Sequence, residues 1–205
     1  TEAEQRNTAL LAADLPYNSL IPFTDNYLAS GRRDLLRQPP PPGCDFAYEG
    51  ADNNTGQYRR DNESELLFTF TDERLRPYLE DQEYLACDGY LSSIGGYRFL
   101  TLKFTFAYPN AREAYGFIDQ NSVLTIKMLN GDFINLRAGV MARGSYDTVR
   151  EELTYEVQYP IDRGLLASLK NSEVDMIRVF WSSGFEEYEI RQMDFFQHQL
   201  RCLGD

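Results

Sequence analysis

The 205-residue chain has only one histidine, His198, and this scarcity limits the catalytic chemistry open to it. Hydrolases with a serine or cysteine nucleophile need a base beside that nucleophile, and the base is most often histidine. The sequence also has no Gly-x-Ser-x-Gly turn and no glycine-rich phosphate loop. We therefore predict that the protein is not an enzyme and that it uses no cofactor.

Long apolar runs are missing, and basic residues are few. No run approaches the roughly 20 apolar residues that a helix needs to cross a bilayer, so we predict no membrane span. The chain has 20 lysines and arginines against 32 aspartates and glutamates, which gives a net charge of −12. Because an acidic surface is repelled by phosphate groups, we expect neither nucleic acid nor an anionic membrane as a partner.

Cysteine is also scarce. Cys44, Cys87 and Cys202 are too few for a disulfide scaffold, and their number is odd. Two arrangements are open: a Cys87–Cys202 disulfide, which would join an expected strand to an expected C-terminal helix, or buried free thiols. A zinc site built from these cysteines and His198 would lack the paired short spacing of zinc motifs, so no metal site is predicted.

The segment Asp52–Gly56 resembles the start of a calcium-binding loop. Its glycine falls one position too early for that motif, and no glutamate stands at the closing position. We therefore expect this segment to be a solvated turn.

Aromatic residues, in contrast, are abundant, with 14 tyrosines and 13 phenylalanines. Such side chains suit the pleated, half-buried surface of a β-sheet. The clearest strand is Leu100–Tyr108, where apolar side chains alternate with small or polar ones. Similar runs predict seven further strands, at residues 66–70, 84–94, 124–128, 133–136, 153–159, 176–181 and 185–190.

Turn residues join these runs into hairpins. Gly95–Gly96 and Asn130–Gly131 each separate two expected strands, and Asn-Gly favours a type I′ turn. Short helices are expected at 110–115, 162–170 and 194–203. Successive hairpins predict an all-β fold, an antiparallel β-sandwich of about eight strands with short peripheral helices; a barrel is the alternative.

The chain divides by composition into three regions. Residues 1–38 are an N-terminal extension, or arm, and residues 39–64 are a spacer and loop that begin with four prolines. Consecutive prolines favour the extended polyproline II conformation, which is stiff. Residues 65–205 are the expected β-sandwich domain. The apolar residues of the arm that we expect to contact a protein partner or a second copy are Leu10, Leu11, Leu15, Ile21 and Phe23.

Three fold-forming stretches carry a resemblance. They are the helix and hairpin of Leu165–Ser172 and Val174–Ile190, the Asn130–Gly131 hairpin, and the ending Asp194–Leu203. In these stretches residues 66–203 resemble a loose group of uncharacterised, β-rich exported proteins of Bacteroidetes. The resemblance implies a secreted or cell-envelope location and assigns no catalytic residue.

Two functions fit these observations. The arm favours a structural or assembly subunit of an exported or cell-envelope complex, acting by protein–protein interaction. The alternative is a module that binds carbohydrate or another ligand. For that alternative, the residues that could stack on a ligand are Trp181, Phe185 and Tyr188, unless these rings point into the core.

Overall fold

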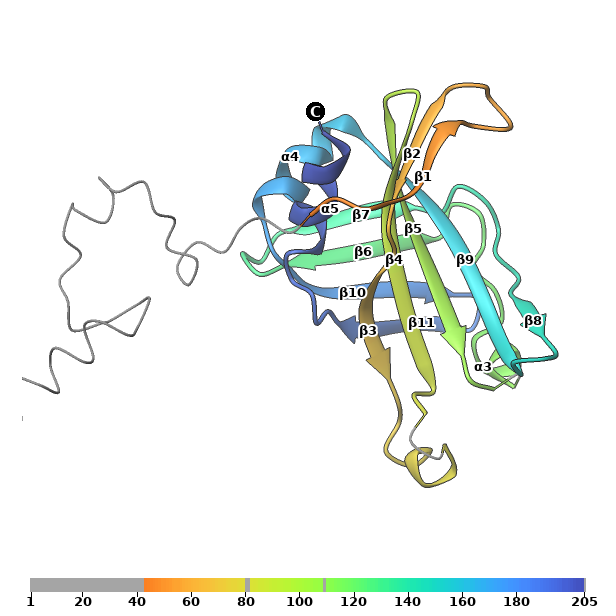
Figure 1. The fold of residues 1–205 in the computed structure, drawn as a ribbon. Coiled ribbons are helices and arrows are strands. Elements are labelled where there is room, and N and C mark those ends of the chain that lie inside the picture. The colour runs from red at the N-terminus through yellow and green to blue at the C-terminus, as the bar shows by residue number, and fades with distance from the viewer. Residues whose placement is uncertain (1–42, 80–81, 109, 205) are drawn as a thin grey trace, which may run out of the picture. The chain divides into compact units, whose positions relative to one another are not determined.

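The computed structural model describes residues 43–79, 82–108 and 110–204 (Figure 1). The residues from Cys44 onward form one compact unit. Within the described residues, eleven strands form two antiparallel sheets. The expected arm residues Leu10, Leu11, Leu15, Ile21 and Phe23 and the proline run at 39–42 lie outside the described residues.

The larger sheet has seven strands in the order β1-β2-β4-β5-β9-β8, with β3 also paired to β4. Strands β2 and β3 lie along the same edge of β4, where β2 pairs with Ser92–Ile94 and β3 with Leu85–Gly89. Its strands are β1 (Phe46–Ala51), β2 (Tyr58–Asn62), β3 (Glu65–Phe70), β4 (Leu85–Ile94), β5 (Tyr97–Phe106), β8 (Ser145–Asp147) and β9 (Glu152–Ile161).

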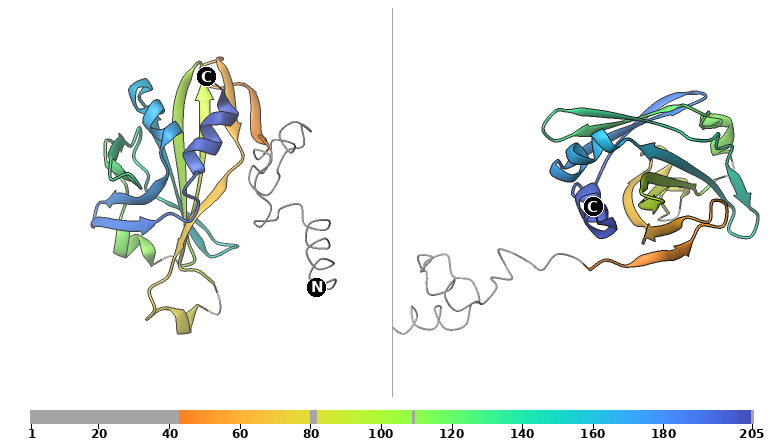
Figure 2. Two further views of the ribbon diagram at one scale, coloured as in Figure 1. Left: turned by 90° about the vertical axis from the view of Figure 1, so that its left-hand side faces the viewer. Right: turned by 90° about the horizontal axis from the view of Figure 1, so that it is seen from above.

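The smaller sheet has four strands in the order β11-β10-β6-β7. Its strands are β6 (Val123–Met128), β7 (Phe133–Arg137), β10 (Val174–Trp181) and β11 (Gly184–Glu189). The helices are the single turn η1 (Arg76–Tyr78), α3 (Ala111–Tyr115), α4 (Arg163–Asn171) and α5 (Phe195–Leu203). Helices α4 and α5 pack side by side at one end of the sheets (Figure 2).

The core lies between the two sheets, whose strands cross steeply (Figure 1). Strand β5 buries Leu100, Leu102, Phe104 and Phe106, while Lys103 between them is exposed. This is the alternation that a strand with one face on a core requires. The predicted all-β, sandwich-like fold is confirmed.

Two strands form where the sequence predicted only a loop. Residues 46–62 make the hairpin β1–β2, so the boundary expected at residue 65 is wrong. These strands have little apolar alternation; instead the Arg60 guanidinium lies 4.7 Å from the centre of the Phe46 ring. Cation–π contacts of this kind leave no period-two signal in a sequence.

The two predicted hairpin turns differ in type. Gly95 and Gly96 both have positive φ, 56° and 85°, as a type I′ turn requires. At the other turn Gly131 has a φ of 90°, but Asn130 is not among the residues with positive φ. The Gly131 N–H donates to the Met128 carbonyl at 3.0 Å, so the hairpin forms without the predicted type I′ geometry.

The predicted Cys87–Cys202 disulfide is wrong. Cys202 is bonded to Cys44, with 5.3 Å between their Cα atoms, and Cys87 is a buried free thiol. The reason is the place where α5 meets β4. Gln199 of α5 binds Leu91, four residues along β4 from Cys87, and four strand residues span about 13 Å.

A buried amide holds helix α5 against the larger sheet. The Gln199 side-chain oxygen accepts hydrogen bonds from the Leu91 N–H and the Asn62 amide, each at 2.9 Å. Its nitrogen donates to the Glu63 carbonyl at 3.1 Å. Beside it, His198 Nδ1 lies 2.8 Å from a Glu65 carboxylate oxygen. The single histidine of the chain is thus engaged where α5 meets β3.

Candidate ligand pocket

A pocket of about 420 Å³ lies between the β3–β4 connection and the segment that follows β5. It is called the tyrosine pocket below. It is lined by Leu75, Tyr78, Leu79, Tyr84, Tyr108 and Asn110. The β3–β4 connection extends away from the sheets (yellow in Figure 1).

Short-range hydrogen bonds shape the β3–β4 connection. The Asp72 carboxylate accepts the Arg74 N–H at 2.9 Å, and its carbonyl accepts the Leu75 N–H at 2.8 Å. This Asx turn leads into η1, where the Tyr78 N–H donates to the Leu75 carbonyl at 2.9 Å. Leu79 is buried and anchors the connection, so the neighbouring Tyr78 is left 73% exposed.

The opposite wall is tied to the connection directly. The Tyr108 hydroxyl donates to the Tyr78 carbonyl at 3.1 Å. Tyr84 enters β4 with its N–H donating to the Thr71 hydroxyl at 2.9 Å and its carbonyl accepting from Ala107 at 3.0 Å. Tyr78 and Tyr84 of the β3–β4 connection and Tyr108 after β5 are therefore held around one hollow.

The floor of the pocket continues into the aromatic core. The Tyr84 ring meets the Phe106 ring edge-on at 5.7 Å and lies 6.5 Å from Tyr115. Burial raises the pKa of Tyr84 above its usual value, and burial also raises the pKa of Tyr115, to about 12. These phenols therefore stay neutral at physiological pH.

The lining is suited to binding rather than to bond breaking. It offers aromatic and aliphatic surface, phenol hydroxyls and the Asn110 amide, and none of these lining side chains is a histidine, cysteine or carboxylate. Concave, mostly apolar sites with a few polar groups are typical of ligand pockets.

The aromatic residues predicted to stack on a ligand are not brought together at the surface. Trp181 and Tyr188 are only 5% and 3% exposed, so the prediction is wrong for both. Trp181 packs edge-on against Phe104 at 5.2 Å, and Tyr188 stacks on Phe68 at 4.4 Å. Trp181 lies in β10 and Tyr188 in β11, and both side chains are on the face of the smaller sheet that packs against the core.

Phe185 is the exception, with 55% of its surface exposed on the outer side of the smaller sheet. The Arg178 guanidinium lies 4.9 Å from its ring centre, and the Phe180 ring lies 5.7 Å away. The Arg178 guanidinium of the same sheet therefore already covers part of the exposed ring.

The residues of the tyrosine pocket were missed because they lie between strands. Tyr78 follows Arg76 and Pro77, and Tyr108 stands at the end of an alternating run. The available signal was an aromatic residue beside proline in a segment without apolar periodicity. A tyrosine in such a segment has no core face to occupy.

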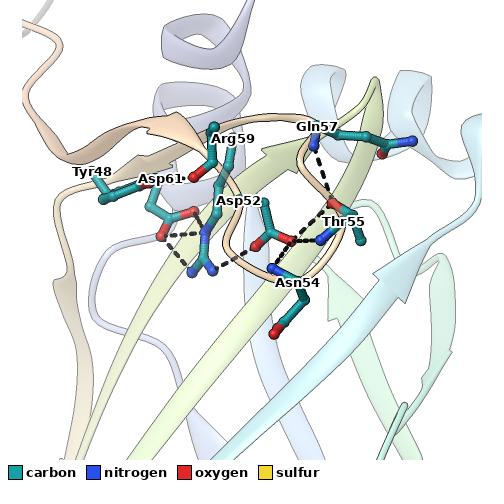
Figure 3. A network of polar contacts seen from close by, with 8 residues as sticks. Tyr48, Asp52, Asn54, Thr55, Gln57, Arg59 and Asp61 are labelled. Carbon is teal, nitrogen blue, oxygen red and sulfur yellow. Dashed lines mark hydrogen bonds and ion pairs between the residues drawn. The ribbon is translucent and has the colours of Figure 1, made fainter.

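A second polar cluster lies in the β1–β2 hairpin (Figure 3). Arg59 bridges two buried carboxylates, with its Nε 2.9 Å from Asp61 and its Nη1 3.3 Å from Asp52. The other Asp52 oxygen accepts the Thr55 N–H at 2.9 Å and the Thr55 hydroxyl at 2.8 Å. These bonds lower the pKa of Asp52, with those from Thr55 the main cause.

Both oxygens of Asp52 are therefore bound by donors of its own hairpin. The segment 52–56 is a turn, as predicted, but its aspartate is buried rather than solvated. The cluster closes the hairpin and positions no group toward a ligand.

Within the described residues, every helix is too short to span a bilayer. The same residues contain no group of three or more histidine, cysteine, aspartate or glutamate side chains placed to hold a metal ion.

Comparison of the chain with protein-family models, curated proteins and solved structures finds no match. The resemblance of residues 66–203 to exported proteins of Bacteroidetes therefore stays a prediction.

Proposed function

We propose that the protein is a non-enzymatic assembly subunit of an exported or cell-envelope complex and that it associates with further copies of itself. The observation that carries the proposal is the tyrosine pocket, with Tyr78 and Tyr108 exposed at its rim. Tyrosine is enriched at protein interfaces because it offers a large, rigid apolar surface with one polar tip.

The Cys44–Cys202 disulfide supports the exported location. Disulfides persist in the periplasm, on cell surfaces and in secreted proteins, and they are rare in the reducing cytosol. Helix α5 is thereby fixed to the start of the compact unit by a bond that suits an oxidising compartment.

The position of His198 supports a non-enzymatic function. It lies on helix α5 against Glu65 of β3 and does not line the tyrosine pocket. The general base that the sequence could supply is thus engaged in the packing of a helix.

Sedimentation equilibrium of the full chain tests the proposal. The average mass should rise above 23.7 kDa as the concentration increases over two orders of magnitude. The measurement is made at low and at high salt, because salt screens both the repulsion between copies of net charge −12 and local attraction between opposite charges. A mass that stays at the monomer value at every concentration and salt level would refute self-association.

The same rings favour a second candidate, a carbohydrate-binding module. Tyr78 and Tyr108 offer planar apolar faces, and Asn110 offers an amide that can bond a sugar hydroxyl. A titration with neutral oligosaccharides, followed by tyrosine resonances in NMR spectra, tests it. Saturable shifts in the wild-type protein that vanish in Tyr78→Ala would support this candidate; no shifts would rule it out for the sugars tested.

A further inference from the structure

We infer that the tyrosine pocket of one molecule receives the proline run Pro39–Pro42 of a second copy. The inference rests on the proposed self-association and names the contact that produces it. The pocket lies within the described residues, and the run precedes them in the sequence.

The chemistry of the two partners matches. Four consecutive prolines favour polyproline II, which is already extended and loses little entropy on binding. Proline-rich segments of this kind dock in aromatic-lined grooves, where their rings pack on aromatic side chains. Proline has no N–H, so such a run presents only carbonyl acceptors. The Tyr78 hydroxyl and the Asn110 amide of the pocket are donors for those carbonyls, whereas the Tyr108 hydroxyl already donates to the Tyr78 carbonyl.

The charges beside the two partners are complementary. The residues directly before the run include Arg32, Arg33 and Arg37 against the single acid Asp34. The β3–β4 connection, residues 71–84, has five acidic residues and two arginines. An arginine-rich flank is therefore attracted to the side of the molecule that forms the pocket.

Covalent geometry assigns the contact to two molecules rather than to one. The Asp45 carbonyl accepts the Glu63 N–H at 3.0 Å, which fixes the chain after Cys44 beside the start of β3. The pocket connection begins at the other end of β3, and the six residues of this strand span about 20 Å. Pro42 is two residues before Cys44, a separation that reaches at most about 7 Å.

The complete run therefore cannot enter the pocket of its own molecule. Each molecule has one run and one pocket, so a mutual exchange between two copies satisfies both. An exchange that continues to a third copy makes an open chain of molecules instead.

Sedimentation equilibrium of full-length variants tests the inference. Tyr78→Ala removes an exposed ring of the pocket, and the double variant Pro40→Ser with Pro41→Ser removes the polyproline character of the run. Each should weaken self-association about tenfold or more, as expected for residues at the centre of an interface. Combining all three substitutions should weaken it little further, because both changes remove the same contact.

Tyr97→Ala is the matched control. Tyr97 is another exposed tyrosine, at 64%, and it lies at the β4–β5 turn outside the pocket. Its substitution should leave association unchanged. A thermal melt of each variant shows that the fold is retained, so that a loss of association cannot be attributed to unfolding.

A peptide with the sequence of residues 32–43 provides an independent measurement. Added in excess, it should dissociate the wild-type assembly, whereas the same peptide with serine at positions 40 and 41 should not. Dissociation by both peptides, or by neither, overturns the inference.

The remaining outcomes separate the inference from the proposed function. If the full chain associates but neither Tyr78→Ala nor the proline variant weakens it, the inference is wrong and self-association stands. If the full chain is monomeric throughout, the proposed self-association fails and the inference fails with it.

Discussion

Gln199 of helix α5 accepts a hydrogen bond from the backbone N–H of Leu91, in the interior of strand β4, at 2.9 Å. The glutamine is only 2% exposed and also bonds Asn62. Leu91 pairs with Leu100 of β5, and on its other side it lies between the stretches of β4 that pair with β3 and with β2. A helix side chain thus satisfies the buried N–H at this gap. The contact links residues 108 positions apart in the sequence.

Gln199→Ala should therefore lower the free energy of unfolding by about 1–3 kcal/mol, because it leaves the Leu91 N–H buried without a partner. Urea denaturation followed by circular dichroism measures the loss. Gln197→Ala, a half-buried glutamine on the same helix, should change stability by less than about 0.5 kcal/mol. Equal losses in the two variants would show that the amide network adds nothing specific.

Breaking the disulfide should destabilise the domain. Cys44→Ser and Cys202→Ser should each lower the free energy of unfolding by about 2–5 kcal/mol, because the bond closes a long loop in the unfolded chain. The double variant should lose no more than either single one. A double variant much less stable than both would mean that each cysteine has a further, independent role.

The thiol of Cys87 should be unreactive in the folded protein. It is fully buried, and desolvation raises its pKa well above the usual value, so the reactive thiolate is scarce. Ellman's reagent should detect no thiol in the native, unreduced protein and one thiol per chain after unfolding in denaturant. Rapid labelling without denaturant would contradict the buried position.

Phe104→Ala should cost about 3–5 kcal/mol of stability through lost burial and the cavity that it leaves. The ring contacts Trp181 and Phe68 from the two sides of the core. Thr105→Ala, the next residue and on the opposite face of β5, should cost less than about 1 kcal/mol. Similar costs from both substitutions would show that the outer face of β5 is packed as tightly as the inner one.

The Asp52 carboxylate should make the free energy of unfolding depend on pH in the acid range. Its pKa is lowered on folding, so its ionised form is stabilised in the native state. That contribution is complete above the unfolded pKa of about 3.9 and is lost as the pH falls through the lower, folded pKa. The free energy of unfolding of Asp52→Asn should therefore fall less than that of the wild type as the pH is lowered from 5 to the pH at which the domain unfolds.

Asp162→Asn, the same substitution at an exposed position beside α4, controls for the loss of one charge. It should leave the acid dependence close to that of the wild type. If Asp52→Asn also keeps the full acid dependence of stability, the contacts of Asp52 with Thr55 and Arg59 are not its cause.

The sequence predicted the parts of the fold that depend on local pattern. Strand β5 alternates from Leu102 to Phe106, and Gly95–Gly96 supplies the two positive φ angles that its hairpin needs. Strands β1 and β2 escaped prediction because arginine–aromatic stacking, not apolar alternation, stabilises them.

The disulfide and the pocket depend on how distant segments meet, which no local pattern encodes. Cys202 could be paired only by knowing that α5 reaches β4 at Leu91 rather than at Cys87. Tyr78 and Tyr108 share a pocket because a hydroxyl of one reaches the carbonyl of the other across 30 positions of sequence. The aromatic content correctly predicted a core. It gave no information on which aromatic side chains lie outside that core.

The Cys44–Cys202 bond also decides how the domain responds to a pulling force. If the protein is held by the residues before Cys44 and pulled by those after Cys202, tension passes through one covalent bond. The strands between these cysteines then bear none of the load. Under oxidising conditions a stretched assembly would extend only outside the domain, and the sandwich would keep its fold until the bond is reduced.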